Sequence, residues 1–468
     1  MGNLLAWLIV IGGIIAAVTA GITTALWIQY FILRRWRTRV RLPDPVAYTD
    51  VPSYRCDKEI ILRIHSSKPI RILFNRCGAR EFCAVHTMEA QPSLQSRVMD
   101  RWLGFDWKPS AVLAPNTLAP GLYRIDIEHR ENPARKWSML LIVKQAVPHA
   151  VVVVASTNTW NAYNDFGGLS NYADRATPHP LKAIRALMMY FDLRVRIGDK
   201  HWLTAVPLPE RRPNRAIHAD LIADPRESSH LARGEAALIR FLEREGIAHT
   251  VVSDRDFGYE LSASQVRLII FNTHSEYWSE EMLGRLNEFI DKGICVAFIS
   301  GNNMYRKVQF LQTAISVIEW MTPPEQVVPL IGTYYDAYGY KTFDAYQVVD
   351  ASHWCFEGIP VEEGSEFGHG NTSRRGASGW ETDKIRTGTH GFRVVAVGKN
   401  SEGPAFMVSR DLQDSFVFTV GSVSFTPCLD DDPVIQKLMC NLVRRALAAG
   451  LNLQETEERI NNVAARRE

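Results

Sequence analysis

The hydrophobic positions of this 468-residue chain follow three different patterns along its length. Residues 4–33 form one apolar run without a charged side chain. Between residues 48 and 144, short apolar runs are separated by turn sequences. From residue 150 onward, continuous apolar runs alternate with longer amphipathic stretches. The three patterns predict an apolar N-terminal segment, then a β domain, then an α/β domain.

The first run is long enough to cross a membrane, since about 20 apolar residues span a bilayer. Aromatic residues flank it, and the basic residues follow it, at Arg34, Arg35, Arg37, Arg39 and Arg41. A signal peptide has its basic residues before a shorter apolar core. The positive flank stays in the cytoplasm. We therefore expect residues 1–41 to be a single-pass anchor with a basic flank, in a bacterial inner membrane, with a cytoplasmic body.

Residues 42–147 show the short, regularly spaced runs of an antiparallel β-sandwich. Examples are residues 60–64 and 70–74, and the alternation in residues 121–127 that follows a Pro-Gly turn. No residue in this region indicates chemistry. We predict a separate β-sandwich domain that binds a ligand or covers the next domain.

Residues 148–452 predict a doubly wound, mostly parallel α/β domain, because buried strands there alternate with amphipathic helices. The expected elements are strands at residues 150–155, 249–252, 266–271 and 294–299, and helices near residues 181–189, 234–245 and 282–292. Residues 328–418 are rich in Gly, Tyr and Trp and predict an irregular insertion over the sheet. A strand at 416–421 and a helix at 433–448 close the domain, before a charged tail at 453–468.

The composition argues against several classes of partner and site. Lys and Arg total 53 against 51 for Asp and Glu, so we expect no nucleic-acid partner, which would require a basic face. The seven cysteines lack CxxC spacing, which argues against a zinc-thiolate site and a disulfide framework.

The candidate chemistry lies in four polar loops that follow predicted strands, at residues 157–172, 273–279, 300–305 and 368–383. In an open parallel sheet such loops converge at the carboxyl edge. His274 and Glu276, two residues apart in an extended turn, point the same way. The alternative is structural: Ser275 or Ser279 caps the next helix, and Glu276 favours its positive end.

Several enzyme classes lack support. No Gly-rich elbow surrounds a serine or cysteine, and neither GxGxxG nor GxxxxGK[ST] occurs in a fitting place. A two-carboxylate glycosidase stays open, with Glu276, Glu381 and Asp430 to Asp432 available. Carboxylates with phenolates also offer the hard, anionic oxygen ligands of a metal site.

Four motifs carry a resemblance to a known family. They are Asn161-Ala162-Tyr163-Asn164, Gly167-Gly168-x-Ser170-x-Tyr172, His274-Ser275-Glu276-Tyr277-Trp278-Ser279 and Ser300-Gly301-Asn302. In this order they resemble the large (beta) subunit of the N,N-dimethylformamidase family, in its C-terminal domain, over residues 148–450.

The resemblance implies a class I glutamine amidotransferase-like fold and hydrolysis of carbon–nitrogen bonds in small amides by one ferric iron. By this resemblance Tyr163, Tyr172 and Glu276 bind the Fe(III), and His274 and Glu381 are catalytic. It also implies an oligomer or a small partner subunit.

The alternative class is a non-catalytic binding module for sugars or cell-envelope material. Such a module keeps the α/β cleft and the sandwich as a recognition surface. Separately, the structural alternative makes Tyr163 and Tyr172 packed aromatics and places His274 and Glu276 at a helix start.

Overall fold

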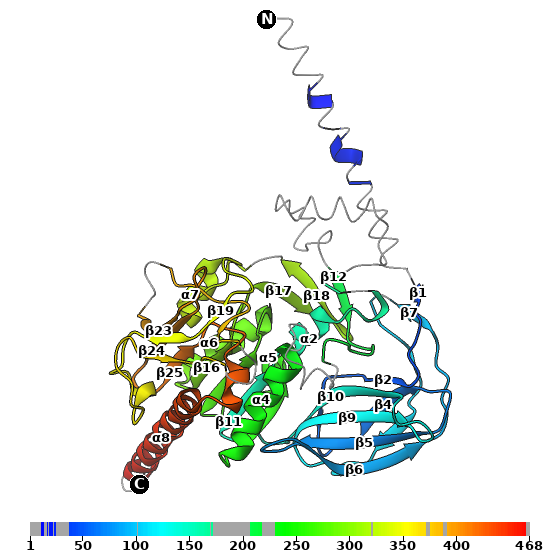
Figure 1. Ribbon diagram of the computed structural model, residues 1–468, viewed down its shortest axis with the longest axis horizontal. Helices are drawn as coiled ribbons and strands as arrows, with labels where there is room; N and C mark the ends of the chain where they lie inside the picture. Colours follow the sequence, from blue (N-terminus) through cyan, green and yellow to red (C-terminus); the bar gives the residue numbers. More distant parts are fainter. Residues whose placement is uncertain are drawn as a thin grey trace, which may run out of the picture.

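The computed structural model describes residues 11–13, 16, 18–21, 23–24, 37–100, 102–168, 170–171, 206–217, 230–319, 322–370, 375–386 and 391–464. Most of the proposed anchor, the expected helix at 181–189 and the candidate ligand Tyr172 lie outside these residues. Within the described part of the chain, no helix has both the length and the apolar character needed to cross a membrane. The described residues between 11 and 24 are helical and project away from the body (Figure 1).

The β domain consists of two facing sheets. The larger sheet has the order β3 (Ser53–Arg55), β10 (Lys136–Lys144), β9 (Gly121–His129), β5 (Ile70–Cys77) and β6 (Phe82–Ala90). The smaller has the order β2 (Val46–Thr49), β4 (Ile60–His65) and β8 (Ala111–Leu113). Residues from both sheets, such as Leu62 and Ile125, share one core, so the two sheets form a sandwich. All these pairs are antiparallel except β3 with β10, which is parallel.

The second domain is built on a nine-stranded sheet that is parallel in one half and antiparallel in the other. The parallel half has the order β13 (His249–Ser253), β11 (Val151–Ala155), β14 (Leu268–Thr273), β16 (Cys295–Ser300) and β25 (Phe416–Thr419). The antiparallel half continues with β24 (Phe406–Asp411), β23 (Arg393–Gly398), β20 (Tyr346–Val348) and β21 (Glu366–Phe367). A further sheet has the order β12 (Val206–Pro209), β18 (Ala314–Glu319), β17 (Arg306–Phe310) and β15 (Tyr277–Ser279).

Helices cover both faces of the parallel strands, because alternate strand residues point to opposite faces. Val151 and Val153 pack in one cluster with α4 (His230–Arg244) and α8 (Pro433–Ala464). Val152 and Val154 pack in another with α5 (Asp254–Tyr259), α6 (Glu280–Asp291) and α7 (Pro324–Ile331). The expected helices on two faces of a parallel sheet are therefore present in this half (Figure 1).

The prediction for residues 328–418 is wrong in part. β23 and β24 in this segment are regular strands that extend the main sheet, and only the remainder is irregular. The closing strand β25 lies between β16 and β24 inside the sheet, because strands that precede it along the chain extend the sheet beyond it. Helix α8 also continues to Ala464, beyond the expected end at residue 448 and into the expected tail.

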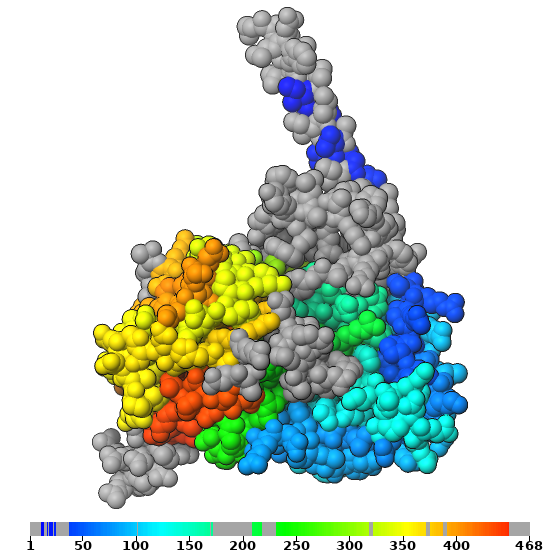
Figure 2. Space-filling view, viewed as in Figure 1, coloured from blue at the N-terminus to red at the C-terminus, as the bar shows by residue number. Residues whose placement is uncertain are grey.

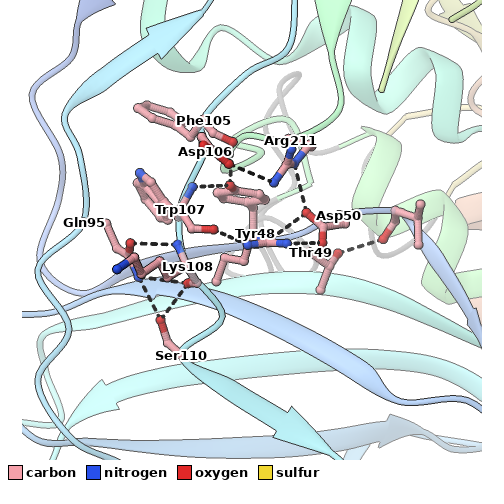
Figure 3. A network of polar contacts seen from close by, with 12 residues as sticks. Tyr48, Thr49, Asp50, Gln95, Phe105, Asp106, Trp107, Lys108, Ser110 and Arg211 are labelled. Carbon is pink, nitrogen blue, oxygen red and sulfur yellow. Dashed lines mark hydrogen bonds and ion pairs between the residues drawn. The ribbon is translucent and has the colours of Figure 1, made fainter. Parts of the chain in front are cut away.

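The sandwich and the α/β domain share a polar and aromatic boundary. Asp50 of the sandwich binds Arg63 at 2.7 Å and Arg211 of the second domain at 3.1 Å (Figure 3). The backbone N–H of Phe105 also donates to Arg211 O at 2.8 Å. Phe166, which follows the helix α2 (Thr157–Tyr163), is buried in the sandwich core. The sandwich therefore supports the loop beyond α2.

Candidate metal centre

The turn between β14 and β15 carries two of the predicted site residues. Thr273 has a φ of 55°, in the left-handed region, so the chain turns sharply as the strand ends. The backbone N–H of Glu276 donates to His274 O at 3.0 Å, and that of Arg306 donates to Glu276 O at 2.9 Å. The hydroxyl of Thr159 on α2 donates to His274 O at 2.7 Å. These bonds hold both side chains in a fixed, buried turn.

Backbone contact determines which ring nitrogen of His274 faces the site. Nδ1 lies 3.0 Å from the carbonyl oxygen of Gly301, which follows β16. A carbonyl only accepts, so Nδ1 carries a proton and Nε2 faces the other site residues. A histidine that binds a metal through one nitrogen commonly donates the other N–H to a backbone carbonyl in this way.

Two carboxylates approach Nε2, the other ring nitrogen of His274. His274 Nε2 lies 3.4 Å from Glu276 Oε2 and 3.2 Å from Glu381 Oε2. Glu276 and His274 are fully buried, and Glu381 is 7% exposed. Glu381 follows β22 (Ser378–Gly379) and Trp380, whose φ of 66° turns the chain toward the site.

Each carboxylate has a further partner that holds it. Arg306 Nε donates to Glu276 Oε1 at 3.2 Å, and Asn302 Nδ2 donates to Glu381 Oε2 at 2.8 Å. The first contact leaves the other oxygen of Glu276 facing His274. Charge-assisted bonds of this kind fix the orientation of a carboxylate.

Tyr163 reaches the same place from a third loop. It is the last residue of α2, and its hydroxyl lies 2.9 Å from His274 Nε2. The two rings pack edge to face, with centroids 5.5 Å apart. The strands β11, β14 and β16 are parallel neighbours, so the loops that follow them converge at one edge.

The donor set fits a cation. Ligand atoms of His274, Glu276 and Glu381 all lie within 4.8 Å of one another. Ligands at about 2 Å from a shared ion lie roughly 3–4 Å apart. The distances from His274 Nε2 to the two carboxylates, 3.4 and 3.2 Å, fall in this range. Two buried carboxylates with one imidazole also carry net negative charge once the imidazole is neutral, so a cation compensates them.

The pKa of His274 reflects the same concentration of negative charge. Burial lowers the pKa of His274, but the adjacent Glu381 and Glu276 raise it more strongly, to about 9. The imidazole therefore holds the positive charge between the carboxylates at neutral pH. A metal ion held by the carboxylates would compensate the same negative charge.

Two further tyrosines lie near the carboxylates: Tyr305, from the candidate loop 300–305, and Tyr335, which the sequence did not indicate. Burial raises the pKa of Tyr305 and of Tyr335, and Glu276 and Glu381 both add to the increase. The rings pack edge to face with centroids 5.1 Å apart, and the Arg306 guanidinium lies 4.4 Å from the Tyr305 centroid. They are buried or partly buried aromatics beside the charged groups.

Buried acids also support the loops from behind. Glu235 on α4 accepts hydrogen bonds from Ser156 N at 2.9 Å and from Asn272 Nδ2 at 2.7 Å, so it ties α2 to the end of β14. Asp383 accepts from Asn302 N at 2.7 Å and Asn303 Nδ2 at 2.7 Å. Burial raises the pKa of Glu235 to about 7 and that of Asp383 to about 6. The sequence analysis did not identify Glu235. The only indication of its role in the sequence is an acidic residue on the apolar face of an amphipathic helix.

Of the residues that the structural alternative assigned to the start of the helix, only Ser279 has that role. Ser279 caps α6 by accepting from Met282 N at 3.3 Å. The first turn of α6 contains Glu280 and Glu281, whereas Glu276 precedes the helix and faces His274. Ser275 accepts from Trp278 Nε1 at 2.9 Å, which is a structural contact.

Most of the acids named for a glycosidase make structural contacts and do not face His274. Asp430 pairs with Arg240 at 2.6 Å, and Asp432 accepts from Ile435 N at 2.9 Å at the start of α8. The exposed His369 lies 3.9 Å from Glu366. These residues make structural contacts, while Glu381 joins His274.

The comparison with protein families identifies the chain. Residues 74–437 match the family described as N,N-dimethylformamidase beta subunit-like, C-terminal, so the chain belongs to this family and the resemblance is confirmed. The match begins within β5, so it includes much of the sandwich as well as the α/β domain. No curated protein matches the chain in sequence.

Solved structures give only distant matches. A Paenibacillus sp. cycloisomaltooligosaccharide glucanotransferase is 8% identical, with a TM-score of 0.18, over 55% of this chain and 53% of that one. A β-glucuronidase from Ruminococcus gnavus is 9% identical, with a TM-score of 0.14, over 61% and 56%. This chain thus spans little more than half the length of each, and these scores carry no argument about function.

Proposed function

We propose that this member of the N,N-dimethylformamidase beta subunit-like family is a metal-dependent hydrolase of carbon–nitrogen bonds in small amides, with one Fe(III). The convergence of His274, Glu276 and Glu381 with the Tyr163 hydroxyl is the observation that carries the proposal. Family membership supports the reaction class, since the family is named for an amidase subunit.

In this proposal Glu276 and Tyr163 hold the cation, with Tyr172 as the second phenolate. A carboxylate and phenolates are hard oxygen donors, which suit a ferric ion. When bound, such a cation would supply Lewis-acid chemistry for an amide carbonyl and would lower the pKa of water toward neutrality. Arg306 keeps Glu276 oriented through its 3.2 Å contact.

His274 and Glu381 then handle protons. Nδ1 of His274 is fixed on Gly301 O, so the mobile proton resides on Nε2. That atom lies 3.2 Å from Glu381 Oε2, within reach of a proton transfer between the two groups. We assign the pair to protonation of the leaving amine. Asn302 holds Glu381 for this step with its 2.8 Å hydrogen bond.

Tyr305 and Tyr335 form the aromatic boundary of the same site. Tyr335 is 8% exposed, and both rings lie close enough for the site carboxylates to affect their hydroxyls. Closely packed aromatics exclude water and restrict the size of a substrate. This arrangement favours small amides.

We also propose that residues 4–33 anchor the enzyme in a bacterial inner membrane with the body in the cytoplasm. The run has no charged residue, and arginines follow it. A Cβ placed on Gly12, Gly13 or Gly21 has no atom within 4 Å, so these positions of the apolar run have room around them. The described residues of this uncharged run are exposed, and a helix that is apolar on all sides is typical of a membrane span. A small partner subunit or an oligomer is part of the proposal through the family name alone.

The test is metal analysis of the purified full chain beside its Tyr163→Phe variant. The proposal expects about one iron per chain and a visible tyrosinate-to-iron absorption band that weakens in the variant. A folded protein that binds no metal contradicts it and favours the binding-module alternative. A different bound metal with retained amide hydrolysis would reject the iron assignment but keep the reaction.

A further inference from the structure

An exposed basic and apolar ribbon lies directly after the proposed anchor. It is the two-stranded sheet of β1 (Arg37–Arg39) and β7 (Val98–Asp100), at the edge of the sandwich (Figures 1 and 2). The register pairs Arg39 with Val98 and Arg37 with Asp100. Residues directly opposite each other in such a pair point to the same face.

The two faces of this ribbon differ. The inward residue Met99 is 1% exposed and belongs to the sandwich core, so the ribbon is fixed to the domain. On the outward face Arg37 and Arg39 are exposed, and Val98 is 42% exposed. A fixed strand pair therefore presents two arginines and an aliphatic side chain outward.

The turn after β7 adds an aliphatic tip. Asp100 and Gly104 exchange backbone hydrogen bonds of 2.9 Å, and Asp100 Oδ1 accepts from Leu103 N at 3.0 Å. The Asp100 carboxylate is thus occupied within its own turn. Leu103 at the tip is 59% exposed, and the exposed Arg97 precedes β7. Asp106 is the exposed acid nearby, and it lies 3.7 Å from Arg211.

Chain length places this ribbon relative to the anchor. Only Arg34, Arg35 and Trp36 separate the apolar run from β1. Four residue steps extend at most about 14 Å, so β1 begins within that distance of the end of the run. If residues 4–33 span the membrane, the ribbon lies at its cytoplasmic surface. The inference in this subsection rests on that proposed anchor.

We propose that the outward face of β1 and β7, with Leu103 at its tip, docks on the anionic lipid surface of the membrane. Arginines near such a surface are attracted to the phospholipid headgroups. Exposed aliphatic side chains between them enter the headgroup region. The contact fixes the orientation of the sandwich, and hence of the α/β domain that packs on it.

The experiment uses the full chain in nanodiscs made either of phosphatidylcholine alone or of equal parts phosphatidylcholine and phosphatidylglycerol. Amide hydrogen exchange of residues 97–104 is compared between the two. We expect slower exchange in the anionic discs, by roughly fivefold for each engaged arginine. The double variant Arg37→Glu, Arg39→Glu loses this difference. The control Arg80→Glu, an exposed arginine in the turn between β5 and β6, keeps it.

Two outcomes overturn the docking surface. One is equal exchange in the two lipid mixtures, and the other is protection that appears only as the protein concentration rises, which indicates a second copy. Alkaline carbonate extraction of native membranes tests the anchor separately. A chain that resists extraction but shows no lipid-dependent exchange retains the anchor and loses the docking surface. A chain that is extracted loses both.

Discussion

Two groups of buried acids in the α/β domain differ in what surrounds them. Glu235 and Asp383 receive hydrogen bonds mainly from neutral amides and backbone N–H groups. Glu276 and Glu381 both face one imidazole nitrogen, at 3.4 and 3.2 Å. Neutral donors satisfy the first group, and burial raises the pKa values of Glu235 and Asp383. The second group concentrates negative charge around one point.

The comparison distinguishes buried acids that support the fold from buried acids that form a site. An acid that neutral donors surround can remain in place as part of the scaffold. Two acids that share one histidine require a proton or a metal ion between them. Burial alone therefore does not identify the site, whereas convergence of like charges on one atom does.

The largest expected effect is at Glu276. Glu276→Gln removes the charge from the residue that we assign as a metal ligand, so we expect loss of iron and a rate decrease of about 10³-fold or more. Metal content and amide hydrolysis measure this together. Glu280→Gln, at an exposed glutamate on α6, is the matched control. A Glu276→Gln enzyme with full activity would remove Glu276 from the metal centre.

His274→Gln tests the division between metal binding and proton transfer. If Tyr163 and Glu276 hold the iron, the variant keeps its metal while kcat falls by roughly 10²–10⁴-fold, as for a lost general acid. His369→Gln, at an exposed histidine, serves as the control. Loss of iron in His274→Gln would instead make this residue a ligand.

The variant Glu235→Gln tests the role of a buried acid through the pH dependence of the free energy of unfolding. The pKa of Glu235 is raised from its ordinary value to about 7, so its stabilising contribution is complete below about pH 4.5 and is lost as pH rises through 7. The Gln variant lacks this loss. Its stability relative to the parent should rise by on the order of 3 kcal/mol between pH 4.5 and 8. Urea unfolding of the metal-free proteins at several pH values provides the measurement, and a pH-independent difference would refute the assignment.

The smallest effect is expected at Ser275. Its hydroxyl accepts from Trp278 Nε1 at 2.9 Å, and its own carbonyl oxygen accepts from the same group at 2.9 Å. Ser275→Ala keeps the second contact, so we expect unchanged kcat/KM and a stability loss of at most about 1 kcal/mol. A large loss of activity would instead indicate that Ser275 takes part in the reaction.

Local patterns in the sequence determined much of the architecture. Helix α6 spans Glu280–Asp291, within two residues of the expected 282–292, because Ser279 caps it and its apolar spacing is regular. The buried strands β11, β14 and β16 were recognisable as continuous apolar runs, and the His-Ser-Glu-Tyr-Trp-Ser motif identified the family. These features depend on neighbouring residues, so a single sequence reveals them.

Only the tertiary structure decided what meets at the site. Glu381 lies far from His274 along the chain, and Arg306, Asn302 and Tyr335 come from other elements. The antiparallel half of the sheet also escaped prediction, because strands in a Gly-rich and Tyr-rich segment show weak periodicity. Such contacts arise from the packing of distant segments, which no local pattern encodes.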